Sequence, residues 1–186
     1  MDDTAAYVES TIRSSRWHMD ALRAVRDLSL SDWAIGAGFV RSAVWDRLHG
    51  YESSSPITDI DVVYFDRDDI SCETENRISQ QLTRALSNYP WSVRNQARMH
   101  VRNNDRPYNS TLDAISFWLE TATCIALRLE TDDTFSILAP HGLQDLVDMR
   151  VVPTPSGGNK IEQYQARIRA KDWRRKWPRL KFMHLD

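Results

Sequence analysis

The chain contains little cysteine and no long apolar run, and these absences exclude several classes of protein. Its 186 residues include only Cys72 and Cys124, whose spacing supports neither a zinc site nor a disulfide framework. No stretch approaches the roughly 18 consecutive apolar residues of a membrane span. The N-terminus has neither the basic region nor the apolar run of a secretory leader. The sequence therefore predicts a cytoplasmic protein without a membrane partner.

Net charge is also small, but it is unevenly distributed. The formal net charge is −2, yet residues 160–186 carry nine basic and three acidic side chains. This basic tail either binds a polyanion or packs against the more acidic remainder of the chain. We favour packing, because most charged helix faces are simply solvated or paired.

Proline and glycine gather in residues 152–159, which contain two of each. This composition predicts a linker between a domain of residues 1–151 and a helical tail of residues 160–186 that packs on the domain. The hydrophobic content of 41% and the charged content of 27% are those of an ordinary globular protein. Seven tryptophans predict a substantial aromatic core.

Hydrophobic periodicity predicts a mixture of helices and strands. Helices are expected at residues 5–28, 38–49, 75–89, 111–119, 142–149 and 160–177. Strands are expected at residues 33–37, 60–65, 91–101, 123–130 and 134–138. The elements do not alternate regularly, which predicts an α/β (α+β) fold with a small mixed β-sheet and helices mainly on one face.

Two carboxylates form the clearest candidate site. Asp59 and Asp61 are two residues apart at the start of an apolar strand, so they point to the same face, about 7 Å apart. Divalent Mg²⁺ prefers hard oxygen ligands and accepts one or two carboxylates together with substrate phosphates. The alternative is a solvated strand face with incidental acidic residues. The apolar setting favours a catalytic and metal-binding role.

A glycine-containing turn precedes this strand. Gly36, Ala37 and Gly38 join an apolar strand to a helix, where glycine permits close approach of a phosphate to free backbone N–H groups. No Gly-Lys-Ser/Thr follows, so the turn is not a P-loop, and the third glycine of a dinucleotide fingerprint is missing. The turn predicts a nucleotide site, with a plain strand-to-helix connection as the alternative.

Two polar residues in the first turn of that helix are candidates for the same phosphate. Arg41 is placed to bind it in bidentate fashion. An ion pair between Arg41 and Asp46, Asp59 or Asp61 is equally consistent with the sequence. Ser42 either binds the phosphate or is an ordinary helix-surface residue.

The strand expected at residues 91–101 has an unusual polar face. Its polar side chains alternate with apolar ones, so this face either lines a cleft or is exposed to solvent. These side chains are Arg94, Gln96, Arg98 and His100, of which His100 is considered as a general base. The remaining histidines lack metal-ligand spacing and are expected to be structural; they are His18, His49, His141 and His184.

At these residues the chain resembles the polymerase-β-type nucleotidyltransferase superfamily. That pattern is a hydrophobic residue and a glycine pair, followed by an Asp-x-Asp strand, here Asp59-Ile60-Asp61-Val62. Ala37-Gly38-Phe39-Val40-Arg41 is similar to the Gly-Gly-x-Val-Arg opening of the tRNA-nucleotidyltransferase and poly(A)-polymerase branch. Over about residues 30–180 the chain is more closely similar to a bacterial family of small nucleotidyltransferase-like proteins. This closer similarity rests on Trp33-Ala34-Ile35-Gly36-Ala37-Gly38, Asn95-Gln96-Ala97-Arg98-Met99-His100, Ala139-Pro140-His141-Gly142-Leu143-Gln144-Asp145-Leu146 and residues 173–180.

The resemblance implies a polymerase-β-like fold and roles for the candidate residues. Asp59 and Asp61 would ligate two Mg²⁺ (or Mn²⁺) ions. The residues expected to bind the NTP are Gly36, Ala37, Gly38, Arg41 and Ser42.

The resemblance also implies a third carboxylate, which is missing from its expected place. The strand at residues 91–101 contains no Asp or Glu, and Asn95 or Gln96 stands where the acid belongs. Asp113 is a candidate from the following segment. An amide positions a group but neither accepts a proton nor holds a cation as strongly.

The expected function is Mg²⁺-dependent transfer of NMP from an NTP to an acceptor hydroxyl on a small molecule, a protein or an RNA. No dedicated RNA-binding module is present. Two alternatives remain: a catalytically impaired nucleotide-binding regulator, which the missing acid favours, and a partner-binding protein that uses the tryptophan-rich basic tail.

Overall fold

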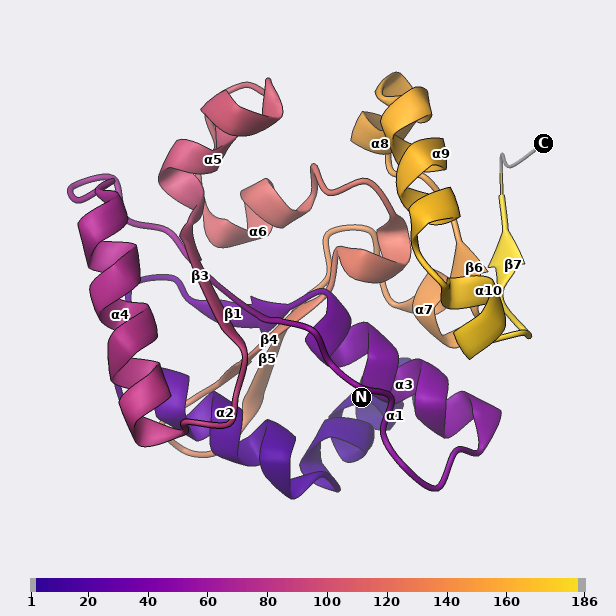
Figure 1. The fold of residues 1–186 in the computed structure, drawn as a ribbon, viewed down its shortest axis with the longest axis horizontal. Helices are drawn as coiled ribbons and strands as arrows, with labels where there is room; N and C mark the ends of the chain where they lie inside the picture. Colours follow the sequence, from indigo (N-terminus) through magenta and orange to yellow (C-terminus); the bar gives the residue numbers. More distant parts are fainter. Residues whose placement is uncertain (1–2, 184–186) are drawn as a thin grey trace.

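Residues 3–183 are described by a computed structural model, and a five-stranded mixed sheet lies at their centre (Figure 1). The strand order is β3-β2-β1-β4-β5, with β2 and β3 parallel and the other neighbours antiparallel. The strands are β1 (Ala34–Gly36), β2 (Ile60–Tyr64), β3 (Trp91–Asn95), β4 (Ala126–Leu129) and β5 (Phe135–Leu138). The predicted small mixed sheet is confirmed.

The helices and a second, two-stranded sheet surround this centre. The helices are α1 (Asp3–Arg13), α2 (Arg16–Arg26), α3 (Gly38–His49), α4 (Cys72–Ala85), α5 (Gln96–Asn103), α6 (Thr111–Ile115), the 3₁₀ turn η1 (Thr121–Thr123), α7 (Gln144–Val147), α8 (Pro155–Asn159), α9 (Ile161–Ala170) and α10 (Trp173–Lys176). The second sheet pairs β6 (Arg150–Val151) with β7 (Lys181–Phe182). In Figure 1, α5, α6, α8 and α9 lie on the upper side, α1 and α2 lie on the lower side, and α4 lies at the left.

The two faces of the sheet are covered unequally. On β2, Ile60, Val62 and Tyr64 point into the main core, which they share with apolar residues of α1, α2, α3 and α4. Val63 belongs instead to a smaller cluster beside α6. Asp61 shares the parity of Val63, so it points away from the main core. This thinner face is where space for a ligand remains.

One predicted strand is wrong in its second half. The strand expected at residues 91–101 ends at Asn95, and α5 follows directly. The Asn95 side chain accepts a hydrogen bond from the Ala97 N–H at 3.0 Å and so caps the helix. The residues that follow are mostly good helix formers. Arg98 and His100 therefore lie on a helix rather than on a strand face.

Two predicted helices are each divided in two. The helix expected at residues 5–28 breaks at Ser15, whose extended backbone precedes α2. The helix expected at residues 160–177 breaks at Lys171, which is also extended. The helix predicted at residues 38–49 is confirmed with these bounds and ends at Gly50, in the left-handed conformation with φ 71°.

Residues 152–159, expected to be a linker, contain the short helix α8. Thr154 Oγ1 accepts a hydrogen bond from the Gly157 N–H at 2.9 Å and donates one to the Trp118 carbonyl at 2.6 Å. A Cβ placed on Gly157 would overlap the Leu119 carbonyl oxygen. This segment is therefore fixed to the body by its backbone, while the division into separate units stays a prediction.

The C-terminal helices pack on α3 through aromatic rings. Trp45 makes edge contacts with Trp173 and Trp177, with ring centroids 5.6 and 5.2 Å apart. All three rings are buried. The tail thus contributes to the core, which accounts for part of the high tryptophan content. Within residues 3–183, no helix combines the length and apolar character needed to cross a membrane.

We predict that Gly157→Ala destabilises the protein by about 2 kcal/mol, because the new methyl group would collide with the Leu119 backbone. Urea unfolding monitored by circular dichroism measures this change. Gly158→Ala is the matched control, since a Cβ there meets nothing within 4 Å. A Gly157 variant as stable as the Gly158 variant would contradict the close packing of α8.

Candidate functional site

The two aspartates lie at one end of β2, on the face away from the main core. Asp61 pairs across the sheet with Gly36 of β1 and with Ser92 of β3. Asp59 stands just before the strand and is exposed, with the Thr58 hydroxyl donating to its Oδ1 at 3.0 Å. Both aspartates line the same cleft.

The electrostatics of this pair favour a cation. Burial, together with repulsion from Asp59, raises the pKa of Asp61 to about 6. The Ser92 hydroxyl and the charges of Arg167 and Arg41 act in the opposite direction. Ionised Asp61 is therefore incompletely compensated by its own protein, and a divalent ion would supply the missing positive charge.

The turn before α3 is strained at Ala37. Its φ of 52° and ψ of −117° lie in a region that residues with a side chain rarely adopt. No side chain caps the first turn of α3, so its N–H groups are open to an anion. A Cβ on Gly38 would lie 3.5 Å from Arg41 Nη2, within the space that a phosphate would use.

Gly36 has a different role from Gly38. A Cβ on Gly36 would approach the Ala126 Cβ to 3.0 Å and the Trp118 ring to 3.2 Å. This glycine therefore permits β1 and β4 to lie close together, and its absent side chain faces protein rather than a ligand.

Arg41 is buried on α3 and forms no ion pair with a carboxylate among the described residues. Its guanidinium lies over the rings of Trp173 and Trp45, at 4.4 and 5.3 Å from their centroids. Its Nε has no hydrogen bond within residues 3–183. Burial and the neighbouring charge of Arg167 lower the pKa of Arg41 to about 10. Ser42 lies beside it, with Oγ 3.5 Å from Arg41 Nη2.

The ion pair between Arg41 and an aspartate, which the sequence allowed, is not found among the described residues. Asp46 instead accepts hydrogen bonds from the Ser55 N–H, the Ser55 hydroxyl and the Trp177 indole, each at 2.7 Å. This one carboxylate ties the loop that precedes Asp59 and the end of α10 to α3.

Two clefts meet at Asp61. The first, about 380 Å³, lies between α3, the loop before β2 and the C-terminal helices. The second, about 450 Å³, lies between β2, β3, α5 and α9. Ala37, Asp61 and Arg167 line both. The first cleft also contains Gly38, Arg41, Ser42, Asp59, Lys171 and Lys176, and the second contains Arg94, Gln96, Arg102, Glu120 and Lys160.

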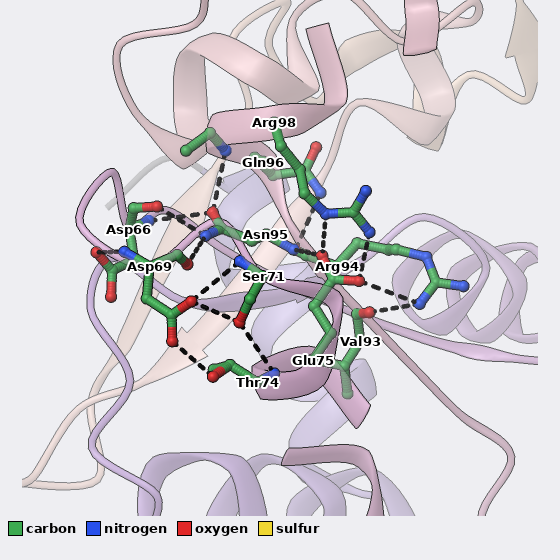
Figure 2. Close-up of polar contacts among 11 residues, drawn as sticks. Asp66, Asp69, Ser71, Thr74, Glu75, Val93, Arg94, Asn95, Gln96 and Arg98 are labelled. Carbon is green, nitrogen blue, oxygen red and sulfur yellow. Dashed lines mark hydrogen bonds and ion pairs between the residues drawn. The ribbon is translucent and has the colours of Figure 1, made fainter. Parts of the chain in front are cut away.

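Asn95 holds the backbone rather than facing a ligand (Figure 2). It is fully buried, and its Oδ1 accepts from the N–H groups of Asp66 and Ala97. Its Nδ2 donates to the carbonyls of Asp66 and Asp69 at 2.7 and 2.9 Å. All four of these bonds are structural.

The predicted polar face is split by the change from strand to helix. Arg98 forms two hydrogen bonds with Glu75, at 2.8 and 2.6 Å, and Figure 2 shows this pair beside Arg94. His100 Nδ1 lies 3.0 Å from the Ala97 carbonyl. Arg98 and His100 do not line either cleft, whereas Arg94 and Gln96 line the second.

The third carboxylate is not supplied by the residues expected to carry it. Asp113 is held by Arg106 through hydrogen bonds of 2.8 and 2.7 Å. A further acid, the buried Glu120, lines the second cleft; sequence reasoning missed it because it stands alone before η1. Within residues 3–183, no cluster of three or more His, Cys, Asp or Glu side chains is arranged to hold a metal. Asp59 and Asp61 would thus need substrate oxygens to complete a coordination shell.

Three of the histidines expected to be structural bond to backbone. They are His18 with the Phe39 carbonyl, His49 with the Trp45 carbonyl and His141 with the Ser116 carbonyl. His184 lies outside the described residues.

These features together are those of a nucleotidyltransferase. The chain matches the model of a nucleotidyltransferase family over residues 23–182, and it therefore belongs to this family. It is also similar to a solved structure described as an NMR structure that reveals a CCA-adding enzyme head domain. The identity is 34%, with a TM-score of 0.83 over 95% of this chain and 94% of that one. The predicted membership of a polymerase-β-type nucleotidyltransferase-like family is confirmed.

More distant structures share the fold alone. Two, each described as a tRNA-processing enzyme, are 16% and 17% identical to this chain, both with a TM-score of 0.55 over 88% of it. The chain spans 45% and 43% of their lengths. Among curated proteins no match is found.

We predict that Ala37→Gly stabilises the protein by about 1 kcal/mol, because glycine adopts the positive φ of this position without the strain of a Cβ. Chemical denaturation measures the change in the free energy of unfolding. In the control, Ala43→Gly within α3, a loss of about 1 kcal/mol is expected. Destabilisation by Ala37→Gly would contradict the strained turn.

We predict that Glu75→Gln destabilises the protein by about 3 kcal/mol, because it removes the buried charge that Arg98 pairs with. Thermal and urea unfolding measure this loss. Glu73→Gln on the exposed side of the same helix is the control, with a change below about 0.5 kcal/mol. Equal stability of both variants would show that the Glu75 pair is not structural.

Proposed function

We propose that this protein is a metal-dependent nucleotidyltransferase that moves NMP from an NTP to an acceptor hydroxyl and releases pyrophosphate. The observation that carries this proposal is the position of Asp61 where the two clefts meet. The family membership supports nucleotidyl transfer in general. The metal, the NTP and the acceptor are proposals.

The side chains present fit Mg²⁺ or Mn²⁺. Asp59 and Asp61 offer hard carboxylate oxygens on one side of the sheet, and burial of Asp61 makes its uncompensated charge costly. When bound, the ion would neutralise phosphate charge and polarise the transferred phosphoryl group. Asp59 and Asp61 would hold it there, together with oxygens of the substrate.

The first cleft suits the triphosphate. The N-terminus of α3, which no side chain caps, lines it, and Arg41 provides a guanidinium whose Nε has no hydrogen bond within residues 3–183. Lys171 and Lys176 of the tail line the same cleft. These groups would bind the β- and γ-phosphates, which leave as pyrophosphate.

The second cleft suits the acceptor. Attacking and leaving oxygens lie roughly in line during transfer to phosphorus, so the acceptor must approach Asp61 from the side opposite to the pyrophosphate. Arg94, Gln96 and Lys160 give this cleft a polar lining. Because a similar structure is described as a CCA-adding enzyme head domain, an RNA end is one acceptor to be tested beside small molecules and proteins.

A nucleotide-binding regulator without transferase activity is the second candidate. The observation that favours it is the absence, within residues 3–183, of a cluster of three metal-binding side chains at the site. In this case NTP and metal would bind without transfer.

We predict that Asp61→Asn lowers label transfer at least a hundredfold, because the metal-holding charge is lost. The purified protein is incubated with each α-labelled NTP, Mg²⁺ or Mn²⁺ and total cell extract, and label in RNA, protein and small molecules is counted. Asp59→Asn is tested in parallel. Asp68→Asn is the control, because Asp68 is exposed and lines neither cleft.

The outcomes separate the two candidates. Label transfer that is lost in Asp61→Asn establishes a transferase and identifies the class of acceptor. Metal-dependent NTP binding by calorimetry without transfer would support the regulator. If metal-dependent binding survived in both aspartate variants, the site itself would be wrong.

A further inference from the structure

Arg167 of α9 lies at the junction of the two clefts. It lines both, as Asp61 does, although the two residues are far apart in the sequence. The charge of Arg167 lowers the pKa of both Asp61 and Arg41. Helix α9 thus contributes a cation to the same two clefts that Asp61 lines.

The environment of Arg167 leaves its guanidinium available to a ligand. Nε lies 2.8 Å from Glu120 Oε1, but neither atom makes a hydrogen bond within residues 3–183. The described residues also accept no hydrogen bond from its Nη atoms. About 37% of its side chain is exposed. Arg167 is therefore held by charge attraction to Glu120, with the Trp173 ring centroid 6.0 Å from its guanidinium carbon, while it lines both clefts.

Glu120 explains why a second arginine is tolerated beside Arg41. Its side chain is 1% exposed, and its carboxylate attracts both Arg41 and Arg167. Thr123 fixes the orientation of this carboxylate by donating to Oε2 at 2.9 Å. Glu120 therefore supports the two arginines electrostatically.

The transferred phosphoryl group must lie where the clefts meet. Its phosphorus receives the acceptor oxygen from one side and releases pyrophosphate to the other. Its remaining oxygens carry charge that spreads during transfer, and fixed cations there are worth more in the transition state than before it. In such a complex, the residues that line both clefts would lie nearest to these oxygens.

We propose that Arg167 is a catalytic residue that binds the oxygens of the transferred α-phosphoryl group, and that Glu120 is the residue that positions it. This inference rests on the proposed function. The acceptor oxygen forms its P–O bond as the P–O bond to pyrophosphate breaks, pyrophosphate leaves with the bonding electrons, and the proton of the acceptor hydroxyl passes to water. Arg167 donates hydrogen bonds without exchanging a proton. The basic tail is thereby part of the active site rather than a separate polyanion-binding surface.

We predict that Arg167→Gln lowers the rate of label transfer at saturating NTP by about 10²- to 10³-fold. The dissociation constant of a non-hydrolysable α,β-methylene NTP with Mg²⁺, measured by calorimetry, changes less than about threefold, because Arg41 and α3 hold the other phosphates. Arg167→Lys retains a larger share of the rate. Glu120→Gln gives an intermediate loss.

Arg169→Gln is the matched control, since Arg169 is an exposed residue of the same helix that lines neither cleft. Urea unfolding of each variant shows whether it is folded, so that a loss of rate can be separated from a loss of structure. A wild-type rate in folded Arg167→Gln would overturn the catalytic role while leaving the transferase intact. A rate loss matched by an equal loss of NTP affinity would make Arg167 an ordinary binding residue. Absence of transfer in the wild-type protein would remove both proposals.

Discussion

The alternation of side chains along β2 is the constraint on which the rest of the site depends. Ile60, Val62 and Tyr64 must face the main core, because this is where the sheet buries its apolar surface. Asp61 is therefore directed to the other face. A shift of one residue in the register would bury the carboxylate among apolar side chains and expose the core residues. Burial of these apolar residues thus fixes the register of β2, and the register fixes the face on which the Asp61 carboxylate lies.

Much of the site is made by elements that are far apart in the sequence. The turn before α3 and the start of β2 supply backbone N–H groups and carboxylates, which are locally encoded. The C-terminal helices supply Arg167, Lys171 and the ring of Trp173 against which Arg41 packs. A nucleotidyltransferase site of this form needs the tail in place, so the high tryptophan content serves the site as well as the core.

The sequence predicted those parts of the fold in which local and long-range signals agree. In α3, hydrophobic spacing and the stop at Gly50 coincide, and the helix has its predicted bounds. The strand of Asp61 was predicted because its apolar residues are continuous. The prediction of one strand over residues 91–101 was wrong after Asn95. The spacing of the apolar residues suits a strand, but the cap at Asn95 and the helix formers that follow it produce a helix.

The sequence predicted the site residues that belong to local motifs and missed those that are brought together only by tertiary packing. Asp59, Asp61, Gly38 and Arg41 belong to contiguous motifs, and the structure brings them to one cleft. Glu120 and Arg167 carry no motif. Only tertiary packing reveals that they meet, because nothing in a linear reading indicates that α9 returns across the end of β2.

The three hydrogen bonds to Asp46 connect two walls of the first cleft. This carboxylate joins the loop before Asp59 to the end of α10, which form two facing walls of the first cleft. Any molecule that contacts both walls adds its binding energy to the docking of the tail, and docking of the tail adds the same amount to binding. The packing of the C-terminal helices and ligand binding in the first cleft are therefore thermodynamically linked through this one carboxylate.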